Sequence, residues 1–161
     1  MFNIVLFEPE IPPNTGNVIR LCANSGSTLH LVRPLGFELT RSAVRRAGLD
    51  YEELAALHVH ASLEDCLAAL GRARLFSVET TGARRYSTAR FAQGDALIFG
   101  PESRGLPPQL LARVPSAQQL RIPMRPRNRS LNLSNAVALV VYEAWRQNDF
   151  KDASAEAPCQ K

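Results

Sequence analysis

The first part of the chain constrains the fold most, because two short apolar runs flank a segment with helical spacing. Residues 2–7 (FNIVLF) and 28–32 (TLHLV) are rich in residues that favour β-strands. Between them, Val18 and Cys22 follow helical spacing, and Gly26 ends the pattern. Two strands joined by a helix normally run parallel in one sheet. The chain is therefore predicted to have an α/β fold built on a mostly parallel sheet.

The rest of the chain repeats this alternation. Further strands are expected at residues 74–79, 96–99 and 119–122, which gives about five or six strands in all. Helices are expected at residues 40–48, 52–57, 62–71 and 107–113, and Ser62 with Asp65 resembles a capping box. Residues 80–91 are expected to form a polar loop. All these elements belong to one domain, residues 1–148, and residues 149–161 are expected to form a disordered tail.

The most apolar helix of the chain is expected to follow Asn132. One face and its extension around the side consist of Leu133, Val137, Val140, Val141 and Ala144 with Ala138, Tyr142 and Trp145. An ordinary surface helix buries about one stripe of side chains. This helix is therefore expected to be either central in its domain or packed against a second chain.

A polar loop without glycine, residues 123–132, leads into this helix and is called the arginine loop below. Pro123 and Pro126 prevent the strand that ends at Ile122 from continuing. Three alternating arginines and then side-chain oxygens follow: Arg125, Arg127, Arg129, Ser130 and Asn132. Such a loop suits an anion or a polar ligand.

A second loop, residues 100–107 (GPESRGLP), directly follows the strand expected at residues 96–99. Gly100 and Gly105 permit close backbone approach and unusual φ angles. The glycine spacing matches neither a dinucleotide fingerprint nor a P-loop, so a simple strand-to-helix turn is an alternative interpretation. Ligands of open α/β sheets bind beyond the carboxyl ends of strands, so this loop and the arginine loop could line one site.

The basic residues favour a nucleic-acid partner. The formal net charge is only +4, but all except two of the 19 basic residues are arginine. Guanidinium groups bind phosphate bidentately and stack on bases. The codon preference of a GC-rich genome is the alternative explanation for this bias.

Neither a metal site nor a membrane segment is expected. Cys22, Cys66 and Cys159 form no CxxC motif, and the histidines are scattered, so no zinc-ligand spacing appears. His58 and His60 would point the same way on a strand, but surface positions are expected for them. No signal peptide is apparent and no apolar run approaches the roughly 20 residues of a membrane span. With an odd number of cysteines, this predicts a reduced, cytoplasmic protein.

Three stretches, NTGNVIR, FGPESRGLP and IPMRPRNRSLNLSN, occur in this order along nearly the whole chain. They resemble the three motifs of the SPOUT class of RNA methyltransferases. PEIPPNTGNVIRLCANSG and RSLNLSNAVALVVYEAWRQ are similar, within that class, to the small single-domain tRNA (cytidine/uridine-34) 2′-O-methyltransferases. The resemblance implies a Rossmann-like sheet with a C-terminal deep trefoil knot, a homodimer whose interface includes the first and last helices, and S-adenosylmethionine as cofactor.

The resemblance also implies roles for individual residues. The cofactor would be held, mainly through backbone groups, at Val78, Gly100, Ile122, Met124, Ser130 and Leu131. Arg20 would act on the ribose 2′-hydroxyl, with Asn14 preceding it in the first motif. Glu102 and Asn132 would shape the site. Alternatively they serve only the loop architecture, through a helix cap at Asn132 and a pairing of Glu102 with Arg20 or Arg104.

Contacts with tRNA are expected from Arg46, Arg125, Arg127 and Arg129, although a solvated helix face would equally explain Arg46. Because the chain has no separate RNA-binding domain, the tRNA would lie on the dimer surface. One subunit would then supply Arg20 and the other the methyl donor. Arg20 would act either as a base assisted by an RNA phosphate or as a cation that stabilises the forming alkoxide.

The implied activity is S-adenosylmethionine-dependent 2′-O-methylation of nucleotide 34 of tRNA, a cytidine or modified uridine, with leucine isoacceptors as expected substrates. Two alternatives remain open at this point. One is a SPOUT methyltransferase that acts on another tRNA or rRNA position, and the other is a non-catalytic RNA-binding dimer. A small dehydrogenase is disfavoured, because no dinucleotide fingerprint follows the first strand.

Overall fold

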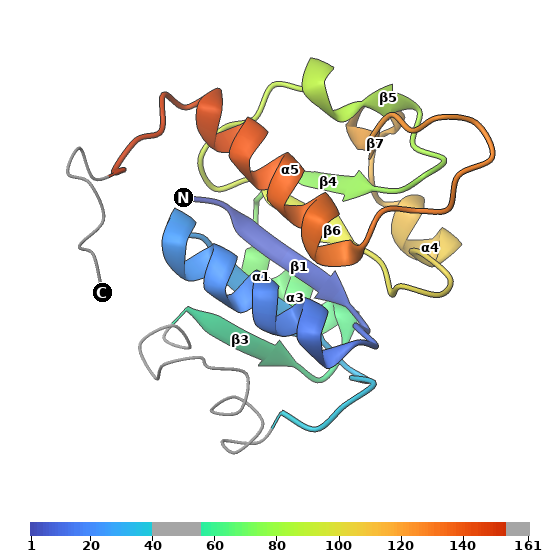
Figure 1. Cartoon of the computed structure of the whole chain (residues 1–161). Coiled ribbons are helices and arrows are strands. Elements are labelled where there is room, and N and C mark those ends of the chain that lie inside the picture. Colours follow the sequence, from blue (N-terminus) through green and yellow to red (C-terminus); the bar gives the residue numbers. More distant parts are fainter. Residues whose placement is uncertain (40–55, 154–161) are drawn as a thin grey trace.

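The structure is a computed structural model that describes residues 1–39 and 56–153 (Figure 1). Within these ranges the sheet has seven strands in the order β3-β2-β1-β6-β4-β7-β5, and every neighbouring pair is parallel. The strands are β1 (Asn3–Phe7), β2 (Thr28–Val32), β3 (Leu57–His60), β4 (Leu75–Val78), β5 (Arg84–Arg85), β6 (Ala96–Phe99) and β7 (Gln119–Arg121). The predicted α/β fold with a mostly parallel sheet is confirmed.

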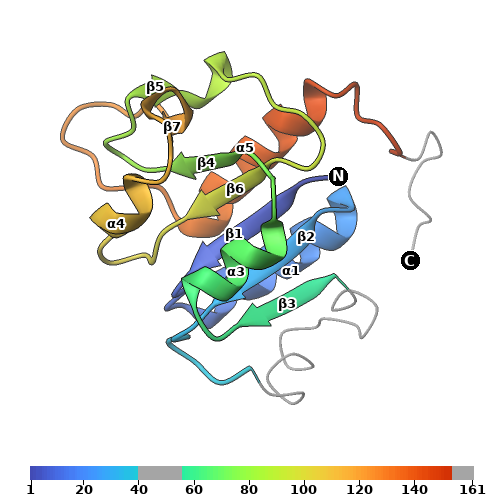
Figure 2. The same ribbon diagram turned by 180° about the vertical axis from the view of Figure 1, so that it is seen from behind.

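Helices cover both faces of the sheet (Figures 1 and 2). On one face α1 (Pro12–Ser25) packs beside α5 (Leu133–Arg146), and on the other lie α3 (Leu63–Leu70) and the short α4 (Pro108–Leu111). Successive strand residues point to opposite faces, so Leu31 belongs to the first core and Val32 to the second. None of the helices in the described ranges has the length and apolar composition that a membrane span requires.

The helix ends follow their local sequence. Pro12 is at the start of α1, where a missing backbone N–H is harmless, and Gly26 ends the helix with φ 66. At the start of α3, Ser62 Oγ accepts a hydrogen bond from the backbone N–H of Asp65 at 3.1 Å. The predicted end of the first helix and the predicted cap at Ser62 are both confirmed.

Strand β3 was not predicted from the sequence. Among the described strands it lies at the edge of the sheet and pairs only with β2, and it exposes His58 and Val59, so it lacks the apolar run that marks a buried strand. The helix predicted for residues 52–57 is wrong at Leu57, which begins β3. It is also wrong at Ala56, which lies in a turn. Residues 52–55, the helix expected at residues 40–48 and Arg46 lie outside the described residues.

The loop predicted for residues 80–91 is more ordered than expected. It contains the two-residue strand β5 and a 3₁₀ turn at Tyr86–Thr88. β5 pairs with β7 at the other edge of the sheet, and both of its arginines are exposed. The predicted count of about five or six strands was therefore too low, because both edge strands are polar or exposed.

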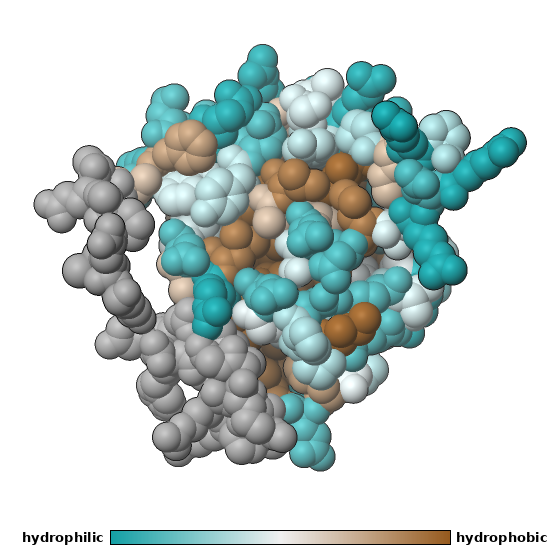
Figure 3. All heavy atoms as spheres, viewed as in Figure 1, coloured by the Kyte–Doolittle hydropathy of each residue, from teal (hydrophilic) through white to brown (hydrophobic). Residues whose placement is uncertain are grey.

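Helix α5 is central in the domain and still leaves apolar surface exposed. The side chains of the predicted face are all buried: Leu133, Val137, Val140, Val141 and Ala144. Trp145 is buried as well, whereas Leu139 and Tyr142 are each 44% exposed. Apolar residues gather on the side of the molecule that α1 and α5 cover (Figure 3). The central position of this helix is confirmed, and Leu139 and Tyr142 form exposed apolar surface on it.

The chain continues to contact α5 beyond its last turn. Trp145 Nε1 donates to the carbonyl oxygen of Lys151 at 2.9 Å, and the ring of Phe150 meets the indole edge-on at 5.5 Å between centroids. Residues 147–152 form consecutive turns. The first residues of the tail predicted at 149–161 therefore lie against α5, and its disorder stays a prediction.

Candidate active site

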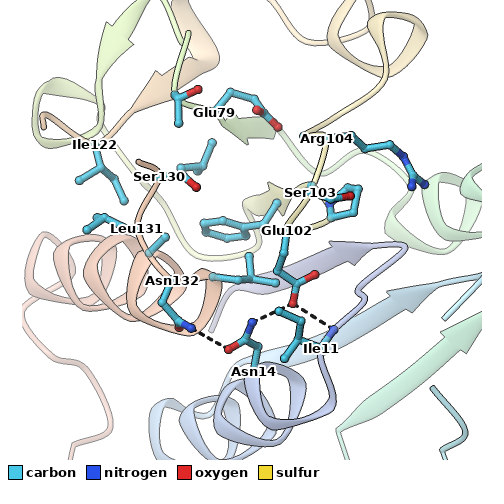
Figure 4. A pocket seen from close by; sticks show the side chains of 18 of the residues that line it. Ile11, Asn14, Glu79, Glu102, Ser103, Arg104, Ile122, Ser130, Leu131 and Asn132 are labelled. Atoms are coloured by element: carbon cyan, nitrogen blue, oxygen red, sulfur yellow. Dashed lines mark hydrogen bonds between the residues drawn. The ribbon is translucent and has the colours of Figure 1, made fainter. Parts of the chain in front are cut away.

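A cavity of about 510 Å³ opens where three neighbouring strands end (Figure 4). Glu79 directly follows β4, Gly100 follows β6 and Ile122 follows β7, and all three residues line the cavity. The carboxyl ends of parallel strands meet at one edge of a sheet, where open α/β proteins bind their ligands. The position of the cavity is therefore that of a ligand site.

Most of the predicted site residues meet in this cavity. Its lining includes Asn14, Val78, Gly100, Glu102, Ile122, Met124, Ser130, Leu131 and Asn132. These residues come from the start of α1, the end of β4, the loop after β6, the end of β7 and the arginine loop. Apolar walls with a few polar groups are typical of small-molecule sites.

The loop after β6 folds back on itself at two glycines. A Cβ atom on Gly100 would lie 2.5 Å from the carbonyl carbon of Gly105 and 2.6 Å from the backbone nitrogen of Leu106. Gly105 has φ +72, in the left-handed region that favours glycine. The close backbone approach and unusual φ predicted for this loop are confirmed.

Hydrogen bonds join the segments around the cavity (Figure 4). The carboxylate of Glu102 accepts from the backbone N–H groups of Glu10 at 2.8 Å and Ile11 at 3.2 Å, and from Asn14 Nδ2 at 2.8 Å. Asn14 Oδ1 in turn accepts from Asn132 Nδ2 at 2.8 Å. Asn14 is only 4% exposed and uses both ends of its amide. Its contacts therefore fix the positions of α1, the loop after β6 and the arginine loop relative to one another.

Asn132 also begins helix α5. Its Oδ1 atom accepts from the backbone N–H groups of Ser134 at 3.0 Å and Asn135 at 3.4 Å, and from Ser134 Oγ at 2.7 Å. These contacts satisfy N–H groups that the first helical turn leaves without an internal partner. The cap predicted at Asn132 is confirmed, and it places the first turn of α5 beside the cavity.

Arg104 does not pair with Glu102, contrary to one of the expected arrangements. Its guanidinium forms ion pairs with Glu8 and, at 3.4 Å, with Glu10. Glu10 also accepts from the backbone N–H of Ser103 at 3.0 Å and from its hydroxyl at 2.7 Å. These contacts attach the loop after β6 to the segment that precedes α1.

Glu79 is a cavity residue to which the sequence analysis gave no role. One carboxylate oxygen accepts from the backbone N–H of Leu106 at 2.7 Å, and the other would lie 2.7 Å from a Cβ on Gly105. Burial raises the pKa of the Glu79 carboxyl, and the hydrogen bond from Leu106 partly opposes that shift. Its place at the carboxyl end of the strand expected at residues 74–79, like that of Ile122 in the strand expected at residues 119–122, was the available signal.

The arginines predicted to act on RNA that lie within the described residues are not part of the cavity lining. Arg20 is exposed on α1, and Arg125, Arg127 and Arg129 are exposed in the arginine loop. Among the described residues, Arg20 is therefore not placed with the predicted cofactor residues of its own chain.

The contacts of Glu102 lead to a first prediction. In Glu102→Gln one side-chain oxygen becomes an NH₂ group, so the donors from Glu10, Ile11 and Asn14 can no longer all be accepted. We expect a loss of about 1–3 kcal/mol in the free energy of unfolding, measured by urea titration. The methyl transfer implied by the resemblance should fall by about tenfold or more, because the segments around the cavity lose their relative positions.

Glu64→Gln is the matched control for this prediction. Glu64 is an exposed residue that pairs with Arg113 at 2.7 Å on the surface of α3. Its replacement should change the free energy of unfolding by no more than about 0.5 kcal/mol. A Glu102→Gln protein as stable and active as the Glu64→Gln protein would contradict the role given to Glu102.

The fold and the cavity define a Rossmann-like α/β protein with a small-molecule site at the carboxyl ends of its central strands. The sequence model of the SpoU rRNA Methylase family matches residues 1–142. The chain belongs to this family.

Individual relatives agree with the family. The chain is 56% identical, over 95% of its length and 99% of the relative, to a tRNA (cytidine(34)-2′-O)-methyltransferase of Methylovorus glucosotrophus. A solved structure concerning the 2-OH methylation of C/U34 on tRNA matches with a TM-score of 0.85 and 49% identity, covering 94% of this chain and 98% of that one. An AdoMet-bound rRNA methyltransferase from Sinorhizobium meliloti shares the fold, with a TM-score of 0.76, 24% identity and coverage of 90% and 56%.

Proposed function

We propose that this chain transfers a methyl group from S-adenosylmethionine to the 2′-hydroxyl of nucleotide 34 of tRNA, a cytidine or a modified uridine. The observation that carries the proposal is the cavity. The three motif segments meet around it, in a chain 56% identical over 95% of its length to a tRNA (cytidine(34)-2′-O)-methyltransferase.

The cavity suits S-adenosylmethionine. Its volume of about 510 Å³ lies within the range of small-molecule sites, roughly 300–1,000 Å³. Val78, Ile122 and Leu131 offer apolar contacts, and the backbone at Gly100 and Ser130 offers hydrogen-bonding groups. When bound, the cofactor supplies a methyl group that its sulfonium centre already activates.

The chain's own residues must orient the ribose hydroxyl and assist the loss of its proton. A 2′-hydroxyl becomes a good nucleophile only as that proton leaves. Arg20 is the residue that we assign to this hydroxyl. A guanidinium is not deprotonated in proteins, so a cation that stabilises the forming alkoxide while water accepts the proton fits better than a base. Asn14, Glu102 and Asn132 keep the site in register for that step.

The proposed active form is a homodimer in which the two subunits share each site. Arg20 is exposed on α1 and does not line the cavity of its own chain among the described residues, which supports its supply from the partner. The exposed Leu139 and Tyr142 on α5 supply apolar surface for the contact. A dimer would also offer the tRNA a larger surface than one subunit does.

The dimer can be tested on helix α5. Leu139→Glu with Tyr142→Glu places two charges on the proposed interface, where desolvation would disfavour association. We expect the dissociation constant, measured by sedimentation equilibrium, to rise at least about tenfold. Val59→Glu, on the edge strand β3 and 40% exposed, is the control and should leave association unchanged. An undiminished dimer in the double variant would contradict this interface.

We also retain the C-terminal trefoil knot as a proposal. Strand β7 lies between β4 and β5, although these two strands follow each other in the chain before it. A later segment inserted between two earlier strands is compatible with threading, which ordinary folds avoid. An experimental structure in which residues 119–147 do not pass through a loop formed by another part of the chain would contradict the knot.

The arginine loop is proposed to contact the tRNA backbone. Replacing Arg125 and Arg127 with Gln should weaken tRNA binding and reduce the magnitude of the negative slope of log affinity against log salt concentration by about 1.4–1.8. Filter binding between low and moderate salt measures this slope. Arg72→Gln with Arg113→Gln, two exposed arginines outside the loop, is the control and should leave it unchanged. An unaltered slope in the loop variant would rule out these phosphate contacts.

The function as a whole is tested by offering the purified protein labelled S-adenosylmethionine with separate pools of tRNA and rRNA from cells lacking the modification. We expect label in tRNA. Label only in rRNA would favour a SPOUT enzyme with another substrate. Absence of cofactor binding in calorimetry would leave a non-catalytic RNA-binding dimer.

A further inference from the structure

A second group of reactive side chains lies away from the cavity, on the side of the sheet where α3 packs. Figure 2 shows α3 over that face. His30 on β2 is 5% exposed, His60 on β3 is half-buried, and Cys66 on α3 is fully buried. One ligand atom from each of these residues lies within 4.8 Å of the other two. The sequence predicted no metal site because these residues are far apart in the chain; the fold brings them together.

Hydrogen bonds determine which nitrogen of His30 faces this group. Asn3 Nδ2 donates to the carbonyl oxygen of Gly94 at 3.0 Å, so Asn3 Oδ1 is the atom that faces His30 Nε2, at 3.3 Å. An amide oxygen can only accept, so His30 Nε2 carries the hydrogen in the neutral ring. The lone pair of His30 Nδ1 is therefore directed at His60 Nε2, 2.9 Å away.

This arrangement is the one that orients metal-binding histidines. Such histidines commonly donate their second ring N–H to an oxygen, which fixes the tautomer and the direction of the ligating lone pair. We propose that His30 Nδ1, His60 Nε2 and Cys66 Sγ bind one zinc-class divalent ion. Imidazole and thiolate are the ligands that zinc and cobalt prefer, and a water molecule would complete a four-coordinate site.

The distances suit such an ion after small movements. Zinc bonds of about 2.0–2.1 Å to nitrogen and 2.3 Å to sulfur place tetrahedral ligand atoms roughly 3.3–3.6 Å apart. The two ring nitrogens, now 2.9 Å apart, would separate slightly, and the sulfur would approach from within 4.8 Å. The half-buried ring of His60 leaves an entry path from solvent.

Protons and charge balance without any change of oxidation state. The ion displaces one proton from Cys66 to solvent, and the hydrogen between the two imidazoles moves to the other ring nitrogen of His60. The nearby carboxylate of Asp65, which favours positive charge on His60, offsets part of the added charge. The bound ion would link β2, the edge strand β3 and α3.

Cobalt provides the test, because its spectrum reports its ligands. Tag-free protein is treated with a chelator, freed of it, and titrated with Co²⁺. We expect one Co²⁺ per chain, the visible absorption of a four-coordinate site and a thiolate-to-cobalt charge-transfer band, all removed by added Zn²⁺. Zn²⁺ should also raise the thermal unfolding temperature. Absence of stoichiometric binding, or a spectrum without the thiolate band, would overturn the proposal.

Variants assign the ligands. Cys66→Ala should lose the charge-transfer band, and His60→Asn, at a half-buried position, provides a second test should Cys66→Ala unfold in circular dichroism. Asn3→Ala should weaken binding by about tenfold or more through the orientation of His30 alone. His58→Ala is the matched control, since His58 stacks on His30 but lies outside the ligand group. Unchanged binding in His60→Asn, or an equal loss in His58→Ala, would overturn the assignment.

Discussion

Arg20→Ala is expected to lower methyl transfer to tRNA by at least about a hundredfold, the usual effect of removing a group that stabilises a developing negative charge. S-adenosylmethionine affinity should stay within about twofold, because Arg20 does not line the cavity among the described residues. Transfer of labelled methyl groups and calorimetric titration measure the two quantities. Arg20→Lys should keep only part of the activity, since lysine retains the charge but not the planar fork.

Arg113→Ala is the control for this prediction. Arg113 is an exposed arginine that pairs with Glu64 on another part of the surface, so its loss should leave methyl transfer unchanged. A loss of less than about tenfold in Arg20→Ala would remove Arg20 from the reaction, whether as base or as cation.

Gly100→Val is expected to abolish S-adenosylmethionine binding. Even the first side-chain carbon would lie 2.5 Å from the carbonyl carbon of Gly105 and 2.6 Å from the nitrogen of Leu106, and both are backbone atoms that cannot rotate away. The loop after β6, which forms one wall of the cavity, must therefore move. We expect cofactor affinity in calorimetry to fall by at least about a hundredfold.

Gly94→Ala separates this effect from a general cost of replacing glycine. Gly94 has φ +87, so alanine is strained there, but among the described residues, its two chain neighbours apart, no atom lies within 4 Å of its added Cβ, and Gly94 is not among the cavity residues. Its variant should lose some stability and keep cofactor affinity. Normal affinity in Gly100→Val, with the fold intact in circular dichroism, would contradict the assignment of the cavity.

Together the two variants test whether the subunits share a site. In a mixed dimer, an Arg20→Ala subunit still has an intact cavity, and a Gly100→Val subunit still has Arg20. If each site combines a cavity with the partner's Arg20, mixing the two inactive proteins restores one complete site per mixed dimer. Persistent inactivity of verified mixed dimers would place Arg20 and the cofactor in the same subunit.

The sequence was most informative where an element buries one face, or where the interacting residues are close to each other in the chain. The apolar face of α5, from Leu133 to Ala144, and the cap at Ser62 depend on residues within a few turns, so their spacing sufficed. β3 was missed because an exposed edge strand needs no apolar run, and because its two histidines interrupt the apolar pattern by which strands are recognised.

The site could be predicted only in part for a different reason. The loops after β6 and β7 were recognised from glycines, prolines and the resemblance of three motifs. The hydrogen bonds of Asn14 to Glu102 and to Asn132, however, join positions 88 and 118 residues apart, and no local pattern specifies them. The cluster of His30, His60 and Cys66 is likewise a product of β2, β3 and α3 packing together.

The most direct test of the central claim is the position of the transferred methyl group. tRNA from cells lacking the modification is methylated by the purified protein with labelled S-adenosylmethionine, then digested with nucleases, and the labelled nucleotide is identified. We predict label on the 2′-oxygen of nucleotide 34, absent with the Gly100→Val protein. Label on a base, or on the ribose of another nucleotide, would contradict it.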